Sequence, residues 1–163
     1  MKKCAMTALV AAAALYGLPA AAADNLVKFE NGFGVDPVAG IASGAPVPNT
    51  VRGVPPGGRP WALRSLKATV KQDGTISVHG EGLVLAGSDA LGTTGAITQV
   101  FATLFCGADA FSSAAVPIDA GGNFEIRDTL GPVPPTPCSS PALLIRNGAG
   151  NNAWFAAGTL STD

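Results

Sequence analysis

The chain has 163 residues, 13% of them charged, and a formal net charge of -1 at pH 7. Basic and acidic residues are nearly equal in number, and the basic residues form no cluster along the chain. The sequence therefore gives no electrostatic support for a nucleic-acid partner. The mature length expected below suits one domain of ordinary size.

The first 23 residues have the pattern of a secretory signal peptide. Lys2 and Lys3 precede an apolar stretch at residues 5–18, and small residues follow at 19–23. The apolar stretch is shorter than the ~20 residues that span a bilayer. We therefore expect a mature chain that starts near Asp24, is exported to the periplasm or the extracellular space, and has no stable membrane insertion. Eight basic and eleven acidic side chains remain once the two lysines are removed, a net charge of -3.

The cysteines predict one disulfide. Cys4 leaves with the signal peptide, so Cys106 and Cys138 remain. In an oxidising compartment such a pair forms a bridge. Closing a loop of this length stabilises a fold by about 3–4 kcal/mol in the chain-entropy model.

Residues 24–60 differ in composition from the rest of the chain, with 7 Gly and 6 Pro. Such a stretch has neither a helical nor a strand period, which predicts an extended arm with one short strand at residues 26–29. The arm is a linker, a segment laid over the domain, or a docking element. For the last of these, Arg52 and Arg59 are candidate ligand contacts.

From Trp61 onward, the period is that of β-strands. Leu66, Ala68 and Val70 alternate with polar residues, and the alternation resumes at Ile76. A three-residue loop at 72–74 matches the faces, places Val70 opposite Ile76, and ends on Gly74, which suits the left-handed position.

A second hairpin is predicted around a loop at residues 120–122. This loop sets Asp119 opposite Asn123 and Ile118 opposite Phe124, and Pro117 predicts that the first strand lies at a sheet edge. Further strands are expected around residues 100–106, where alternate side chains face opposite sides, and at 143–146 and 153–159.

About seven short strands, no helix and one disulfide predict an all-β fold, an antiparallel β-sandwich over residues 61–163. Residues 119–126 resemble the edge hairpins of immunoglobulin-like and transthyretin-like modules in secreted bacterial proteins. Residues 102–107 and 142–147 are similar to segments of uncharacterised secreted bacterial proteins. The resemblance implies an immunoglobulin-like sandwich, and it carries over no catalytic or binding residue.

His79 is the only histidine, which limits the chemistry of the chain. A metal site built on several imidazoles is excluded within one chain, and we expect no metal and no cofactor. His79 and Glu81 share a strand face and form a candidate polar pair. The hairpin register sets His79 opposite Lys67, so a solvated cross-strand charge cluster explains the same residues without any function.

The two tryptophans are the best candidates for a ligand platform. Trp154 lies in a strand of small residues, where a large side chain usually fills the core. Trp61 opens the first strand after the arm, where it either caps the sandwich or lies exposed as a ligand contact.

These patterns predict an exported module without catalytic residues, which binds an unknown protein or glycan partner or serves a structural role. The alternative is a secreted hydrolase that uses two carboxylates, because scattered aspartates could converge in space. A third hypothesis is a component that docks through residues 24–60 by adding a strand to a partner's sheet.

Overall fold

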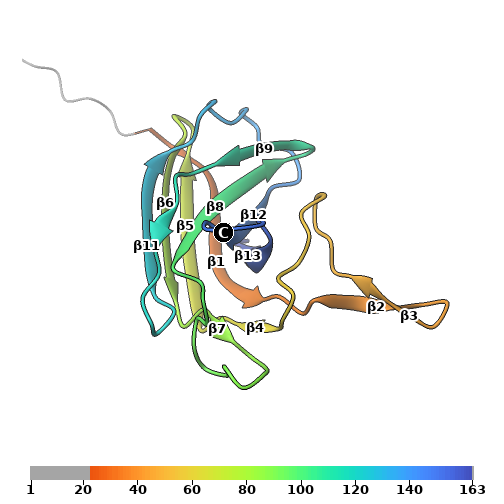
Figure 1. Cartoon of the computed structure of the whole chain (residues 1–163). Coiled ribbons are helices and arrows are strands. Elements are labelled where there is room, and N and C mark those ends of the chain that lie inside the picture. The colour runs from red at the N-terminus through yellow and green to blue at the C-terminus, as the bar shows by residue number, and fades with distance from the viewer. Residues whose placement is uncertain (1–22, 163) are drawn as a thin grey trace, which may run out of the picture.

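The computed structural model describes residues 23–162, and the fold is all-β (Figure 1). The expected signal peptide therefore lies outside the described residues. The strands are β1 (Asn25–Gly34), β2 (Val38–Ala42), β3 (Ala45–Pro48), β4 (Trp61–Ala62), β5 (Ser65–Lys71), β6 (Thr75–Glu81), β7 (Val84–Leu85), β8 (Gln99–Cys106), β9 (Asp109–Ser112), β10 (Val116–Pro117), β11 (Phe124–Thr129), β12 (Ala142–Asn147) and β13 (Trp154–Leu160). Over these residues there is no helix that is long and apolar enough to cross a membrane.

Nine strands form one antiparallel sheet. Its order is β10–β8–β12–β13–β1–β5–β6–β11, with β9 paired to β8. The sheet curls into a half-barrel (Figure 1). Its two end strands, β10 and β11, lie close to each other. The other four strands form two small sheets, β2–β3 and β4–β7. The expected immunoglobulin-like sandwich is not confirmed.

The β5–β6 hairpin is confirmed at the predicted register. Val70 pairs with Ile76, and Gly74 ends the loop with a φ of 86°. Both valine and isoleucine are fully buried inside the curl, while His79 lies opposite Lys67 on the outer face. The two-residue period alone was sufficient here because one face of the hairpin is core and the other is solvent.

The second predicted hairpin is only partly correct. The Asp119 N–H donates to the Asn123 carbonyl over 3.0 Å, as expected of that loop. However, β10 pairs with β8, and Phe124 of β11 pairs with Gly80 of β6, so the predicted pairing of Ile118 with Phe124 is wrong. Each strand finds its partner at its own end of the curled sheet, and the loop joins the two ends. Pro117 does lie on an edge strand, as predicted.

Strand β8 is buried on both faces between Ala102 and Cys106, where we expected burial to alternate. The disulfide between Cys106 and Cys138 is confirmed. It ties the loop at residues 131–141 to the end of β8, and the Gly107 N–H donates to the Ser139 carbonyl beside it over 2.6 Å.

The start of the segment expected as an arm is a central strand of the sheet. β1 pairs with β13 on one side and β5 on the other, and Phe29 is 1% exposed. The expected strand at residues 26–29 is part of it. At Gly34 a Cβ atom would collide with the Trp61 carbonyl. The glycine therefore allows the backbones of β1 and β4 to lie close together.

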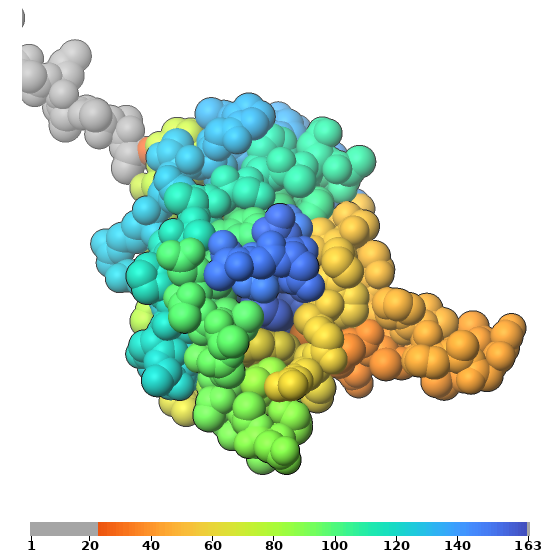
Figure 2. Space-filling model, viewed as in Figure 1, coloured from red at the N-terminus to blue at the C-terminus, as the bar shows by residue number. Residues whose placement is uncertain are grey.

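The rest of that segment divides into two parts. β2 and β3 form a hairpin that projects from the body (Figures 1 and 2). Residues 49–60 return along β13, where the Trp154 N–H donates to the Pro55 carbonyl over 3.0 Å and the Gly57 N–H donates to the Trp154 carbonyl over 2.9 Å. Only the hairpin therefore resembles the extended element expected from composition.

Candidate functional site

A hollow beside Trp61 is the best candidate for a binding site. Its volume is about 310 Å³, at the lower end of the range for small-molecule sites. We call it the Trp61 hollow. Its lining includes the side chains of Arg59, Trp61, Leu85, Thr94, Ile97 and Phe155.

Three separate parts of the chain position the aromatic wall of this hollow. Trp61 of β4 pairs with Leu85 of β7, and its N–H donates to the Val35 carbonyl over 2.9 Å. Phe155 of β13 stacks on Trp61, with ring centroids 4.3 Å apart and planes inclined by 27°. The backbone of Gly57 lies against both rings, since a Cβ at this position would be 2.8 Å from the Phe155 ring. Contacts within the protein therefore hold the aromatic side of the hollow in place without a ligand.

The structure settles the positions of the two tryptophans. Trp61 is only 6% exposed, so it caps the end of the core and does not form a flat exposed platform. Trp154 is a core residue, as predicted, and its indole Nε1 donates to the Asn49 carbonyl over 2.9 Å.

Two polar groups on the lining lack protein partners. Within residues 23–162, neither the Trp61 indole N–H nor the Thr94 hydroxyl makes a hydrogen bond, although both residues are largely buried. No fully enclosed side-chain nitrogen or oxygen in this part of the chain lacks a partner, so both groups keep some contact with solvent. The exposed Arg59 guanidinium stands nearby and makes one long contact of 3.4 Å with the Ser88 hydroxyl. These three groups are hydrogen-bond donors, and two amide side chains, Asn147 and Asn151, also line the otherwise apolar hollow.

Only two of the three predicted contacts meet in this hollow. Arg59 and Trp61 both line it, whereas Arg52 donates to the Ser140 carbonyl over 3.0 Å and is not part of the lining. The sequence interpretation missed Leu85, Thr94 and Phe155. Only Phe155, an aromatic residue beside Trp154, carried any signal in the sequence.

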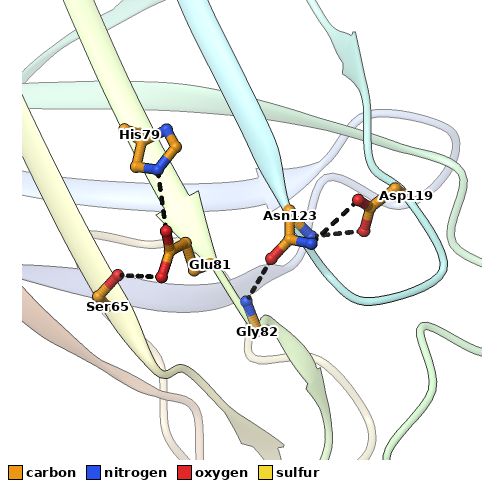
Figure 3. Close-up of polar contacts among 6 residues, drawn as sticks. All are labelled: Ser65, His79, Glu81, Gly82, Asp119 and Asn123. Atoms are coloured by element: carbon orange, nitrogen blue, oxygen red, sulfur yellow. Dashed lines mark hydrogen bonds and ion pairs between the residues drawn. The ribbon is translucent and has the colours of Figure 1, made fainter.

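The candidate pair of His79 and Glu81 exists, and it lies on the outer face of the sheet (Figure 3). Glu81 accepts a hydrogen bond from Ser65 Oγ and contacts His79 Nε2, each over 3.2 Å. The side chains of His79 and Glu81 are 58% and 43% exposed. The hydrogen bond from His79, followed by that from Ser65, lowers the pKa of the Glu81 carboxyl. Since both contacts end on Glu81, the arrangement does not position Ser65 for activation by His79.

A second polar cluster joins the turn before β11 to the end of β6 (Figure 3). Asp119 accepts hydrogen bonds from the Asn123 N–H over 2.8 Å and from Asn123 Nδ2 over 3.0 Å. Asn123 Oδ1 in turn accepts from the Gly82 N–H over 3.2 Å. The bonds from Asn123 lower the pKa of the Asp119 carboxyl. This cluster closes a turn, a structural role.

Neither cluster has the properties of a catalytic acid or a metal centre. A carboxylic acid that donates a proton near neutral pH needs a raised pKa. Hydrogen bonds instead lower the pKa of Asp73, Glu81 and Asp119, all three at the surface. Residues 23–162 contain no group of three or more His, Cys, Asp or Glu side chains placed to hold a metal ion.

Comparison of the chain with known protein families, with curated proteins and with solved structures gives no match.

Proposed function

We propose that this protein is an exported, non-catalytic binding module whose ligand site is the Trp61 hollow. The observation that carries the proposal is the pair of unbonded donors, Trp61 Nε1 and Thr94 Oγ1, on a largely apolar lining. Because both donors keep some contact with solvent, an acceptor on a ligand can take the place of water at each of them. Pockets that combine apolar walls with a few polar groups are the usual form of a ligand site.

The ligand class follows from the lining. The stacked rings of Trp61 and Phe155 offer apolar surface, and Trp61, Thr94 and Arg59 offer donors. A small ring that carries acceptor oxygens, and best a negative charge for Arg59, matches this set. A sugar residue of a glycan and an aromatic carboxylate both have this chemistry.

Export is supported by the signal-peptide pattern of residues 1–23 together with the Cys106–Cys138 disulfide, which is typical of oxidising compartments. The immunoglobulin-like relationship stays a prediction, and the binding proposal does not depend on it. The hydrolase alternative is not favoured, because the carboxyl pKa values that depart from normal are lowered.

The test is a titration of the isotopically labelled protein, followed by NMR, with benzoate, benzyl alcohol and a set of monosaccharides. A ligand in the hollow should shift the Trp61 Nε1–H resonance and the amide of Gly95. Benzoate should bind more tightly than benzyl alcohol, and Arg59→Gln should remove this difference, since only benzoate carries a charge.

Two matched variants separate the hollow from the rest of the surface. Ala96→Phe places a ring in the hollow from an exposed position of the lining, and should abolish the shifts. Ala110→Phe places the same ring at an exposed position of β9, outside the hollow, and should leave them unchanged. The proposal fails if no compound in the set moves Trp61 Nε1–H, or if Ala96→Phe leaves binding intact.

A further inference from the structure

The β2–β3 hairpin is the most exposed apolar element of the described chain. It stands away from the body (Figure 2), and every residue from 38 to 48 is exposed, including Ile41 at 69%. No charged residue occurs between Asp36 and Arg52. An isolated two-stranded hairpin is marginally stable in water, and exposed apolar surface of this kind usually marks an interaction site.

The turn of the hairpin determines which backbone groups point outward. Ser43 and Gly44 both have positive φ, 50° and 78°, and form a two-residue turn between Ala42 and Ala45. The residues that flank such a turn form a hydrogen-bonded pair, so the next pair, Ile41 and Pro46, is not hydrogen-bonded across the hairpin. The backbone nitrogens of Ile41 and Pro46 therefore both face away from the partner strand.

The two outer edges of the hairpin consequently differ. Pro46 has no N–H, so the outer edge of β3 lacks a donor at this point and resists the addition of a strand. Ile41 does have an N–H, so the outer edge of β2 presents both a donor and an acceptor. Only the β2 edge is open for pairing.

The register also sorts the side chains by face. Pro46 and Pro48 are two residues apart and share a face, which their partners Ile41 and Val38 must share with them. The opposite face carries mainly small residues: Gly40, Ala42, Ala45 and Val47. One face of the hairpin is thus a continuous apolar surface.

We propose that β2 of one copy pairs antiparallel with β2 of a second copy about a two-fold axis, forming a four-stranded sheet in the order β3–β2–β2–β3. A two-fold contact brings identical surfaces together, so a charge close to the axis would face its own copy and repel it; β2 carries no charge. The hairpins project, so the two negatively charged bodies stay apart. The proline-blocked β3 edges lie outermost and stop growth at the dimer.

The occupant is a second copy because this hairpin is complementary to itself. Pairing at Ile41 needs a second strand whose edge is also open and uncharged, and β2 of another copy meets both conditions. The single open edge limits pairing to one strand. The contact is small, so we expect a weak dimer that forms only at high protein concentration.

The test is sedimentation of the purified protein over a wide range of concentration. The wild type should pass from monomer to dimer, without larger species. Ile41→Pro removes the outward-facing N–H of β2, just as Pro46 lacks one on β3, and it removes no hydrogen bond within the hairpin. This variant should weaken the dimer about tenfold or more. Ile41→Val retains the N–H and the apolar side chain, and should leave the dimer unchanged.

Two further measurements keep the test independent of folding defects. Replacing residues 38–48 by Gly-Gly should give a folded monomer, because the Asn49 N–H and the Pro37 carbonyl already lie 2.9 Å apart at the base of the hairpin. Hydrogen exchange of the Ile41 amide in the wild type should slow as concentration rises. A monomer at every concentration overturns the proposal, even if the hairpin then binds lipid vesicles or another protein. A dimer that survives loss of the hairpin overturns it as well.

Discussion

Asp119 shows how a single carboxylate can hold a corner of this fold. It accepts two hydrogen bonds from Asn123, and Asn123 holds the Gly82 N–H on the neighbouring segment. These bonds require the ionised form of Asp119, which is why its pKa lies below the ordinary value of 3.8.

A dependence of stability on pH follows from this lowered pKa. A carboxyl whose folded pKa is depressed stabilises the fold above its unfolded pKa, and this contribution is lost as the pH falls through the folded pKa. Asp119→Asn should therefore unfold at lower urea concentration than the wild type at pH 7. The difference should shrink as the pH falls below 3.8. Urea titrations from pH 7 to about pH 2 measure this, and a difference that stays constant over that range would contradict it.

Gly122 is required at the same corner for two reasons. Its φ is 78°, and a Cβ would collide with the backbone of Leu83, whose N–H donates to the Gly122 carbonyl over 2.9 Å. We expect Gly122→Ala to lower the free energy of unfolding by about 3 kcal/mol or more.

Gly107 provides the matched control for this substitution. It has a similar φ of 66°, and no atom lies within 4 Å of the position that a Cβ would take. Gly107→Ala should lower the free energy of unfolding by only about 1 kcal/mol, the cost of the backbone conformation alone. Equal losses for the two variants in urea denaturation would show that the contact with Leu83 is unimportant.

At the scale of elements, the disulfide anchors a long loop that contributes no strand to the sheet. The loop at residues 131–141 contains no strand, and it is tied to the end of β8 by Cys138. The bridge encloses a sequence separation of 32 residues.

Removal of this bridge should lower the free energy of unfolding by about 3–4 kcal/mol, because the unfolded chain regains the entropy of the open loop. The double variant Cys106→Ser, Cys138→Ser should equal the reduced wild type in urea denaturation. Adding a reductant to the double variant should have no further effect. A loss below about 1 kcal/mol would argue against a stabilising role.

At the scale of the whole molecule, residues 24–60 combine a core strand with an exposed, projecting hairpin. Phe29 of β1 is buried between strands that are distant in sequence, whereas the hairpin touches solvent on both faces. Phe29→Ala should lower the free energy of unfolding by about 3–5 kcal/mol through the cavity it leaves.

Replacing the hairpin, residues 38–48, by Gly-Gly should by contrast change the free energy of unfolding by less than about 0.5 kcal/mol, because no core contact is lost. Thermal and urea denaturation of both variants, measured at low protein concentration, test the difference. A large loss for the hairpin variant would mean that the projection supports the body.

The sequence alone determined those features that depend on local periodicity and on residue chemistry. The two-residue alternation and Gly74 were enough to predict the β5–β6 register, because a slip of one residue would turn Val70 and Ile76 to solvent. Two remaining cysteines were enough to predict the bridge between Cys106 and Cys138.

Only the tertiary structure decided how distant segments meet. A segment rich in glycine and proline can be an extended arm, or it can contain a strand whose backbone lies close to another. Composition does not separate the two cases, so most of β1 was predicted as part of an arm. The residues that line the Trp61 hollow are spread between positions 57 and 155. A local alternation of apolar and polar residues cannot predict that they lie together. Strand order in a curled sheet depends on long-range pairing, which is a property of the whole chain and not of any one segment.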